Sequence, residues 1–139
     1  MAPPEVLAEL SEARRPGPVQ AFASQPPVWI EVRCPRVMET IPRLHPGEQA
    51  AISLSSELGA VLLLMDEKDG RRVAVERQIP ITGTVGVLER AAAQGLIDLR
   101  QAFTRLKTTD FWIRPDFLDD RLRAFEERLS QISRAHRSH

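Results

Sequence analysis

The chain has 139 residues, of which 42% are hydrophobic, which is enough for one globular domain with its own core. It carries 19 basic and 19 acidic side chains, so its net charge of zero excludes a global basic field, and any nucleic-acid surface must be local. The longest apolar stretch, residues 59–65, is too short to cross a bilayer, so no membrane association is expected.

The first third of the chain predicts one helix and one strand. The helix starts at Pro3 or Pro4, because proline is tolerated in a first helical turn, and it stops before the RPGP breaker at residues 15–18. Four prolines in residues 16–27 indicate a connection. The alternation in VWIEVR, residues 28–33, predicts a strand. The inward-facing residues of this strand are Val28, Ile30 and Val32.

The middle of the chain is more regular. PGEQAAISLSSELG predicts a helix with Pro46 in its first turn and Gly59 as its stop. Its expected buried face consists of Ala50, Ala51, Ile52, Leu54 and Leu58. The run AVLLLM, residues 60–65, has the length and composition of a parallel strand that is covered on both faces.

From residue 69 onward, short helices alternate with a second short strand. Residues 69–78 and 83–95 predict helices, the second ending at Gly95, and residues 79–82 predict a strand between them. Two further helices follow, broken around residues 111–115, and residues 133–139 are expected to be a frayed tail. This alternation indicates an α/β fold with a parallel sheet in a single domain over residues 1–139. Both tryptophans, Trp29 and Trp112, adjoin apolar residues and are expected in the core.

Two acids stand at positions that the predicted elements make significant. Asp66 follows the apolar strand, and the carboxyl ends of parallel strands face the ligand-binding crevice of α/β sheets. Glu48 lies in the first turn of the helix that begins at Pro46. Each also has a purely structural explanation: Asp66 as a helix cap, and Glu48 as an acid that favours the helix dipole. Pattern alone leaves both explanations open.

The remaining polar side chains give fewer candidates. Arg71 and Arg72 follow the acids and could meet a phosphate backbone, so they are the candidate nucleic-acid-binding residues. Cys34 is the only cysteine, which excludes an internal disulfide and favours a cytoplasmic location. With one cysteine and three histidines, the composition argues against a zinc site.

The stretch HPGEQAAISLSSELGAVLLLMDEKDGRRVA, followed by IPITGTVGVLERAAAQGLI, resembles the PIN-domain superfamily. It is most similar to a bacterial and archaeal subgroup of nucleic-acid-binding proteins related to toxin-type ribonucleases. The likeness extends from PPEVLAEL through LRQAFTRLKTTDFWIRPDFLDDRL, over about residues 3–123. It implies a three-layer α/β/α domain with a short parallel sheet. It also implies cleavage of RNA with Mg²⁺ or Mn²⁺, and as partners an antitoxin protein and a second copy of the chain.

The resemblance assigns roles to four acids. Glu9 matches the early-helix acid, Glu48 the acid of the Gly-Glu pair, and Asp66 the acid after the leucine-rich strand, with Asp69 as an auxiliary ligand. All four are candidate metal ligands, and Glu48 and Asp66 are the candidate catalytic residues. The chemistry fits, because Mg²⁺ prefers oxygen ligands and lowers the pKa of a bound water.

One feature of the family has no counterpart in residues 1–139. The family's first strand ends in an Asp before the early helix, so we expect the domain to be incomplete at its N-terminus, with its first two strands missing. Residues 28–33 should then be unpaired, paired differently, or completed by another chain. The preferred interpretation is a metal-dependent ribonuclease of the toxin-related class if the acidic site is complete. The alternative is an inactive PIN-like remnant or interaction module. Accordingly, we expect weak Mg²⁺ or Mn²⁺ binding and little or no cleavage by residues 1–139.

Overall fold

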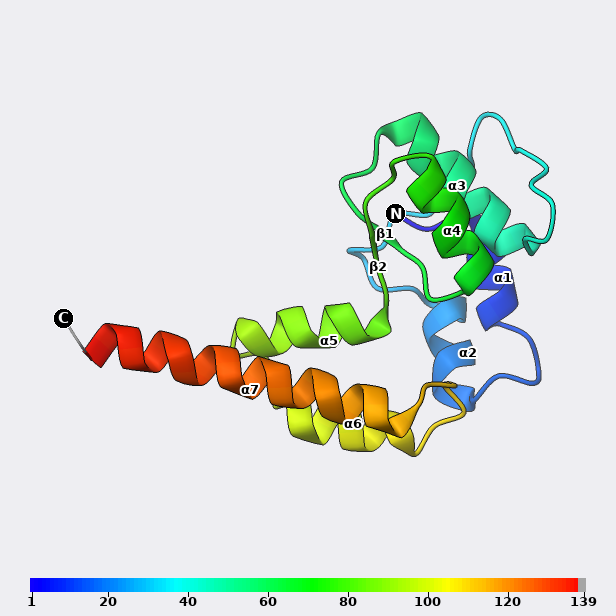
Figure 1. The fold of residues 1–139 in the computed structure, drawn as a ribbon. Helices are drawn as coiled ribbons and strands as arrows, with labels where there is room; N and C mark the ends of the chain where they lie inside the picture. The colour runs from blue at the N-terminus through cyan, green and yellow to red at the C-terminus, as the bar shows by residue number, and fades with distance from the viewer. Residues whose placement is uncertain (138–139) are drawn as a thin grey trace. The chain divides into compact units, whose positions relative to one another are not determined.

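The computed structural model describes residues 1–137 as a chain of helices with one short parallel sheet (Figure 1). Its elements are α1 (Pro4–Leu10), α2 (Gly17–Ser24), α3 (Pro46–Leu58), β1 (Leu63–Leu64), α4 (Lys68–Glu76), β2 (Ile81–Thr82), α5 (Thr84–Ala93), α6 (Leu99–Lys107) and α7 (Pro115–Arg137). The chain divides into two compact units, residues 1–84 and the part that begins at Val85. The predicted mixed α/β class with a parallel sheet is confirmed.

Helix α3 forms where the sequence predicts it, because both of its ends carry local signals. Pro46 opens the first turn, and Gly59 ends the helix in the left-handed region at φ 58°. Ala50, Ile52 and Leu54 are buried as expected, whereas Leu58 is 38% exposed and does not belong to the buried face.

The two strands pair in parallel, with Leu63 opposite Ile81 and Leu64 opposite Thr82. The pairing extends by one residue, since the Met65 N–H donates to the Thr82 carbonyl at 2.8 Å. The strand expected over residues 60–65 is therefore much shorter. It is also covered on one face only: Leu63 and Met65 are buried, while Leu64 between them is 58% exposed.

The core of residues 1–84 lies between α3, α4 and the covered face of the sheet. Its buried residues are Ile41, Leu44, Ile52, Leu63, Met65, Val73 and Ala74. Helix α4 approaches the strand closely, because a Cβ on Gly70 would lie 2.6 Å from the Met65 sulfur. This packing holds Met65, the residue after β1, against α4, and so positions Asp66 and Glu67, which follow it.

Several predictions in the first third of the chain are wrong. Residues 16–27, expected to be a connection, contain helix α2, whose first turn begins directly after Pro16. Residues 28–33 do not form a strand of the sheet. Their pairing is a single parallel bridge between Ala2 and Val32, and Trp29, expected in the core, is 75% exposed. The first helix is also shorter than expected and ends at Leu10.

Helices α5, α6 and α7, which form where the sequence predicts helices, pack around a second core. Its buried residues are Leu99, Phe103, Leu118 and Phe125. An ion pair between the buried Glu89 and the exposed Arg121 joins two of these helices: Arg121 on α7 donates through Nε to Glu89 Oε1 on α5 at 2.7 Å and through Nη2 to Glu89 Oε2. Trp112, in the loop before α7, is 87% exposed, so its expected place in the core is also wrong.

The C-terminal part expected to fray is helical as far as Arg137, and residues 138 and 139 of that expected tail lie outside the described residues. Within residues 1–137, the structure contains no helix that is long and apolar enough to span a membrane.

Candidate acidic site

Glu9 and α3 meet at the first turn of α3. Helix α1 carries Glu9 to this point, where Glu9 Oε1 accepts a hydrogen bond from the Gly47 N–H at 2.9 Å. The contact requires glycine at position 47, since a Cβ there would lie 2.8 Å from the Glu9 carboxylate. Gly47 is buried and Glu9 is half-buried. The glycine of the Gly-Glu motif thus leaves room for the Glu9 carboxylate to bind a free N–H group at the start of α3.

Glu48, the next residue, caps the same helix. Its Oε2 accepts from the His45 N–H at 2.9 Å, a capping contact that adds to the favourable dipole position expected from the sequence. The pKa of the Glu48 carboxyl is nevertheless raised, chiefly by burial and further by the negative charges of Glu67 and Glu9. The hydrogen bond from His45 lowers the pKa and only partly offsets these effects. Glu48 is therefore an acid whose charge is poorly compensated.

Glu67 is the acid of this cluster that sequence reasoning missed. It directly follows Asp66 and caps α4, with Oε2 accepting from the Gly70 N–H at 2.8 Å. Burial raises its pKa, but hydrogen bonds from the N–H groups at the start of α4 outweigh burial and hold the pKa below its usual range. Glu67 is thus ionised and repels Glu48. The available signal was its position as an N-cap three residues before Gly70.

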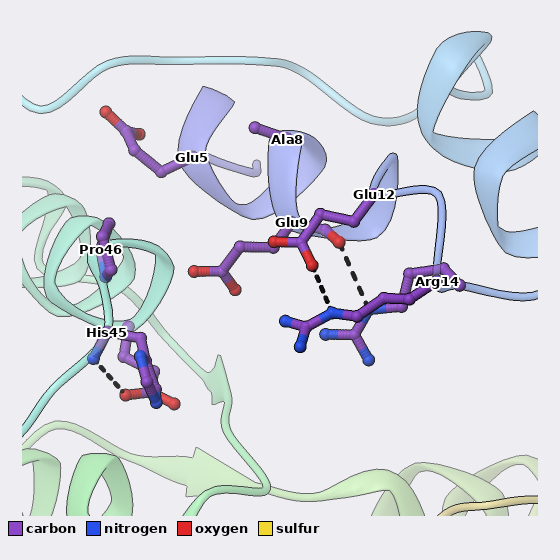
Figure 2. A pocket seen from close by; sticks show the side chains of 9 residues that line it. Glu5, Ala8, Glu9, Glu12, Arg14, His45 and Pro46 are labelled. Atoms are coloured by element: carbon purple, nitrogen blue, oxygen red, sulfur yellow. Dashed lines mark hydrogen bonds and ion pairs between the residues drawn. The ribbon is translucent and has the colours of Figure 1, made fainter.

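Glu9 and Glu48 line a pocket of about 520 Å³ between α1 and the start of α3 (Figure 2). Figure 2 shows the Glu9 side chain reaching from α1 toward His45 and Pro46. Arg14 and Arg15 also line the pocket, but Arg14 pairs with Glu12 at 2.5 Å, and Arg15 donates to the Glu9 backbone carbonyl at 3.3 Å. The full lining is Glu5, Ala8, Glu9, Glu12, Arg14, Arg15, His45, Pro46 and Glu48.

Asp66 lies at the end of β1, as predicted, and its carboxylate joins the two strand ends. Oδ1 accepts from the Thr84 N–H at 2.7 Å, and Oδ2 accepts from the Thr84 hydroxyl at 2.6 Å. A Cβ on Gly83 would lie 2.7 Å from Asp66 Oδ1 and 3.2 Å from Arg71 Nη1. Both oxygens of Asp66 therefore have a partner at the start of α5, whereas the cap of the next helix, α4, which the pattern allowed for Asp66, is supplied by Glu67.

The other candidate residues lie on α4. The Arg71 guanidinium turns inward, and its Nη1 donates to the Met65 carbonyl at 2.8 Å, which places Arg71 beside Asp66. Arg72 pairs with Glu76 at 2.9 Å and lies 3.9 Å from Asp69, so its charge is largely matched on the helix surface. Asp69 is in the first turn of α4, two residues after the N-cap Glu67.

The carboxylates supply oxygen donors of the kind that a divalent metal ion prefers. Among residues 1–137, no group of three or more His, Cys, Asp or Glu side chains is arranged to hold a metal. The hydrogen bonds described above use Glu9 Oε1 and Glu48 Oε2 and leave the second oxygen of each carboxylate for a ligand. Mg²⁺ keeps several waters and is commonly held by one or two carboxylates, so the chemistry of these oxygen donors is compatible with a hydrated Mg²⁺.

The structure therefore defines a small α/β fold with carboxylates at the start of α3 and at the strand ends. A family model described as a PIN domain matches residues 1–127, and the chain belongs to this family. The predicted resemblance is confirmed, and with it a nuclease-like fold of the nucleic-acid-binding kind. Neither a curated protein nor a solved structure matches the chain.

Proposed function

We propose that this protein binds RNA and a divalent metal ion, Mg²⁺ or Mn²⁺, at the acidic pocket, and that it is a metal-dependent ribonuclease of the toxin-related class. The observation that carries the proposal is the convergence of Glu9 and Glu48. They come from separate elements, line one pocket, and the charge of Glu9 helps raise the pKa of Glu48. Gathered carboxylates repel one another, and a divalent cation between them relieves that repulsion.

Glu9 and Glu48 would hold the metal through the oxygens that α3 leaves free, and Asp66 and Asp69 stay candidate ligands from the strand end and from α4. The metal would activate a water and neutralise charge on the phosphate. Arg71, fixed beside Asp66 by the Met65 carbonyl, would place a positive charge near the RNA backbone. Arg72 would contribute less to RNA binding, because Asp69 and Glu76 on the same helix neutralise its charge.

A second reading is favoured by the contacts of Asp66. Both of its oxygens are engaged by Thr84, so Asp66 would have to release those hydrogen bonds to coordinate a metal. On this reading the chain is a PIN-like nucleic-acid-binding or interaction module that does not cleave. A cytoplasmic location, an antitoxin partner and a homodimer belong to the first proposal and follow from its toxin-related class.

Metal binding is tested by thermal unfolding with Mn²⁺, with Mg²⁺ and with a chelator. A ligand present at ten times its Kd stabilises a folded protein by about 1.4 kcal/mol, which gives a measurable rise in Tm. We expect Glu48→Gln to remove this rise. The matched control is Glu57→Gln on the same helix, outside the pocket, where Glu57 accepts from the Arg36 N–H at 2.7 Å. An equal rise in both variants would contradict metal binding at Glu48.

Cleavage is tested on a mixture of single-stranded and structured RNA with the same variants. Chelator-sensitive cleavage that Glu48→Gln abolishes and Glu57→Gln retains would support the ribonuclease. RNA binding without cleavage, in the presence of a bound metal, would support the second reading. A protein that gains no stability from either metal and does not bind RNA would contradict both.

A further inference from the structure

A groove separate from the acidic pocket runs between α5 and the second half of α7, within the unit that begins at Val85. Its volume is about 360 Å³. The residues that matter are Phe125, Leu129 and Ile132 of α7, which give an apolar floor, and Arg90 and Arg128, which line its sides. The groove belongs to no part of the proposed RNA or metal site.

The floor of the groove continues a regular apolar stripe along α7. The stripe repeats at alternating spacings of four and three residues, which is the pattern of helices that pack against other helices. Its members are Leu118, Leu122, Phe125, Leu129 and Ile132. Its first part is covered by α5 and α6, with Leu118 fully buried and Phe125 8% exposed. Leu129 and Ile132 are 45% and 55% exposed, so the stripe extends beyond the helices that cover it.

The charges around the groove indicate which charge a binding partner must carry. Glu89 also lines the groove, but both of its oxygens are bound by Arg121. Within the part of the chain that the structure describes, no ion pair engages Arg90 or Arg128. The free charge at the rim is therefore positive. A second copy that presented the same groove would bring arginines against arginines, which disfavours self-association at this surface.

We propose that this groove is a docking site for an amphipathic helix of a partner protein. The partner helix would place apolar side chains, spaced three and four residues apart, on Phe125, Leu129 and Ile132. Carboxylates on its flanks would face Arg90 and Arg128. Docking of this kind buries the exposed end of the stripe and gives both arginines a partner. A nucleic acid fits less well, because the exposed part of the floor, Leu129 and Ile132, is aliphatic, and the Phe125 ring is buried and not free for base stacking.

The probe for this proposal is a synthetic helical peptide of about 15 residues, with Leu at heptad positions and Glu on both flanks. Its binding to the full chain is followed by fluorescence anisotropy, and a peptide with Lys in place of Glu is the charge control. We expect the acidic peptide to bind at least about tenfold more tightly than the basic one. Equal binding of the two peptides, or no binding of the acidic one, would overturn the proposal.

Variants locate the peptide on the protein. Ile132→Asp, at an exposed position of the groove, should abolish binding, and Arg128→Glu should weaken it by about tenfold and reverse the charge preference. The matched control is Leu96→Asp, at a side chain that is 70% exposed and outside the groove, which should leave binding unchanged. Displacement of the peptide by a single-stranded oligonucleotide, or a dimer of the protein alone that Ile132→Asp dissociates, would assign the groove to another occupant and refute the proposal.

Discussion

Asp66 and Thr84 join the ends of the two strands, with the Thr84 N–H 2.7 Å from Asp66 Oδ1 and its hydroxyl 2.6 Å from Oδ2. An amide in place of the carboxylate can keep both contacts, because its oxygen accepts from the N–H and its NH₂ donates to the hydroxyl. We therefore expect Asp66→Asn to leave the free energy of unfolding within about 0.5 kcal/mol of wild type. Asp66→Ala, which removes both contacts, should cost about 1 to 2 kcal/mol. Urea denaturation measures both.

The variants Asp66→Asn and Asp66→Ala also distinguish a structural role of Asp66 from a role as a metal ligand. If Asp66→Asn lowers the affinity for Mn²⁺ while stability is unchanged, the carboxylate acts as a ligand. Unchanged affinity in the Asn variant would leave Asp66 as the capping residue alone. Equal destabilisation by Asn and by Ala would show that the negative charge itself stabilises the strand ends, contrary to the first expectation.

Gly47 controls the place of Glu9. In Gly47→Ala, the new methyl group would lie 2.8 Å from the Glu9 carboxylate, so this flexible side chain must move away. We expect the loss of the Glu9–Gly47 hydrogen bond to cost about 1 kcal/mol. The affinity for Mn²⁺ should fall by about tenfold, since one of the two proposed ligands leaves the pocket.

The control for Gly47→Ala is Glu9→Gln, which can keep the hydrogen bond from the Gly47 N–H through its amide oxygen. This variant should retain stability and lose metal affinity. Isothermal titration with Mn²⁺ measures both variants. A Gly47→Ala protein with wild-type affinity would show that Glu9 is not a ligand.

Glu48 gives the protein a defined pH dependence. Burial and the neighbouring carboxylates raise its pKa in the folded state, so in the window above its ordinary pKa the folded chain binds more protons than the unfolded chain. Its contribution to the free energy of unfolding therefore falls as the pH rises through that window. Glu48→Gln should remove this slope, and thermal unfolding at a series of pH values measures it. A steeper fall in the variant would contradict the raised pKa.

Metal binding at Glu48 should depend on pH in the opposite sense. A carboxylate must lose its proton to bind Mg²⁺ or Mn²⁺, so affinity should weaken as the pH falls through the raised pKa. Glu67 offers a contrast, because its pKa is lowered in the folded state. Its stabilising contribution is therefore lost as the pH falls from the ordinary pKa of a Glu side chain through this lowered pKa. Mn²⁺ titrations in buffers on either side of the Glu48 titration measure this effect.

The ion pair of Glu89 and Arg121 is a stability determinant outside both proposed sites. Glu89 is 9% exposed, and Arg121→Met would leave its charge nearly buried without a partner. We expect a loss of about 2 kcal/mol, less than for a fully buried pair, because the Arg121 side chain is 46% exposed. The double variant Arg121→Met with Glu89→Leu should recover much of the loss. Chemical denaturation tests this, and a double variant as unstable as Arg121→Met would refute it.

The sequence by itself determined most of the helices from α3 onward and the parallel sheet. Their signals are local: Pro46 and Gly59 set the ends of α3, and Gly95, with φ 73°, follows α5 where the sequence predicts a stop. The resemblance to the PIN family could also be recognised from the sequence, because its Gly-Glu and Asp-Glu motifs lie at the boundaries of helices and strands. Glycine and proline act through their own backbone geometry, so no distant partner is needed to interpret them.

Only the tertiary structure decided that residues 28–33 do not join the sheet, how short the two strands are, and which acids meet. Residues 28–33 alternate like a strand, but a strand exists only through hydrogen bonds to a neighbour, and this segment finds a single bridge to Ala2. Glu9 and Glu48 are far apart in sequence, and their meeting depends on how α1 packs on α3. Glu67 joins the cluster through the packing of α4, whereas Asp66, the more prominent acid in the sequence, is held by Thr84. Periodicity records which face of an element is apolar, but long-range packing determines which charges become neighbours.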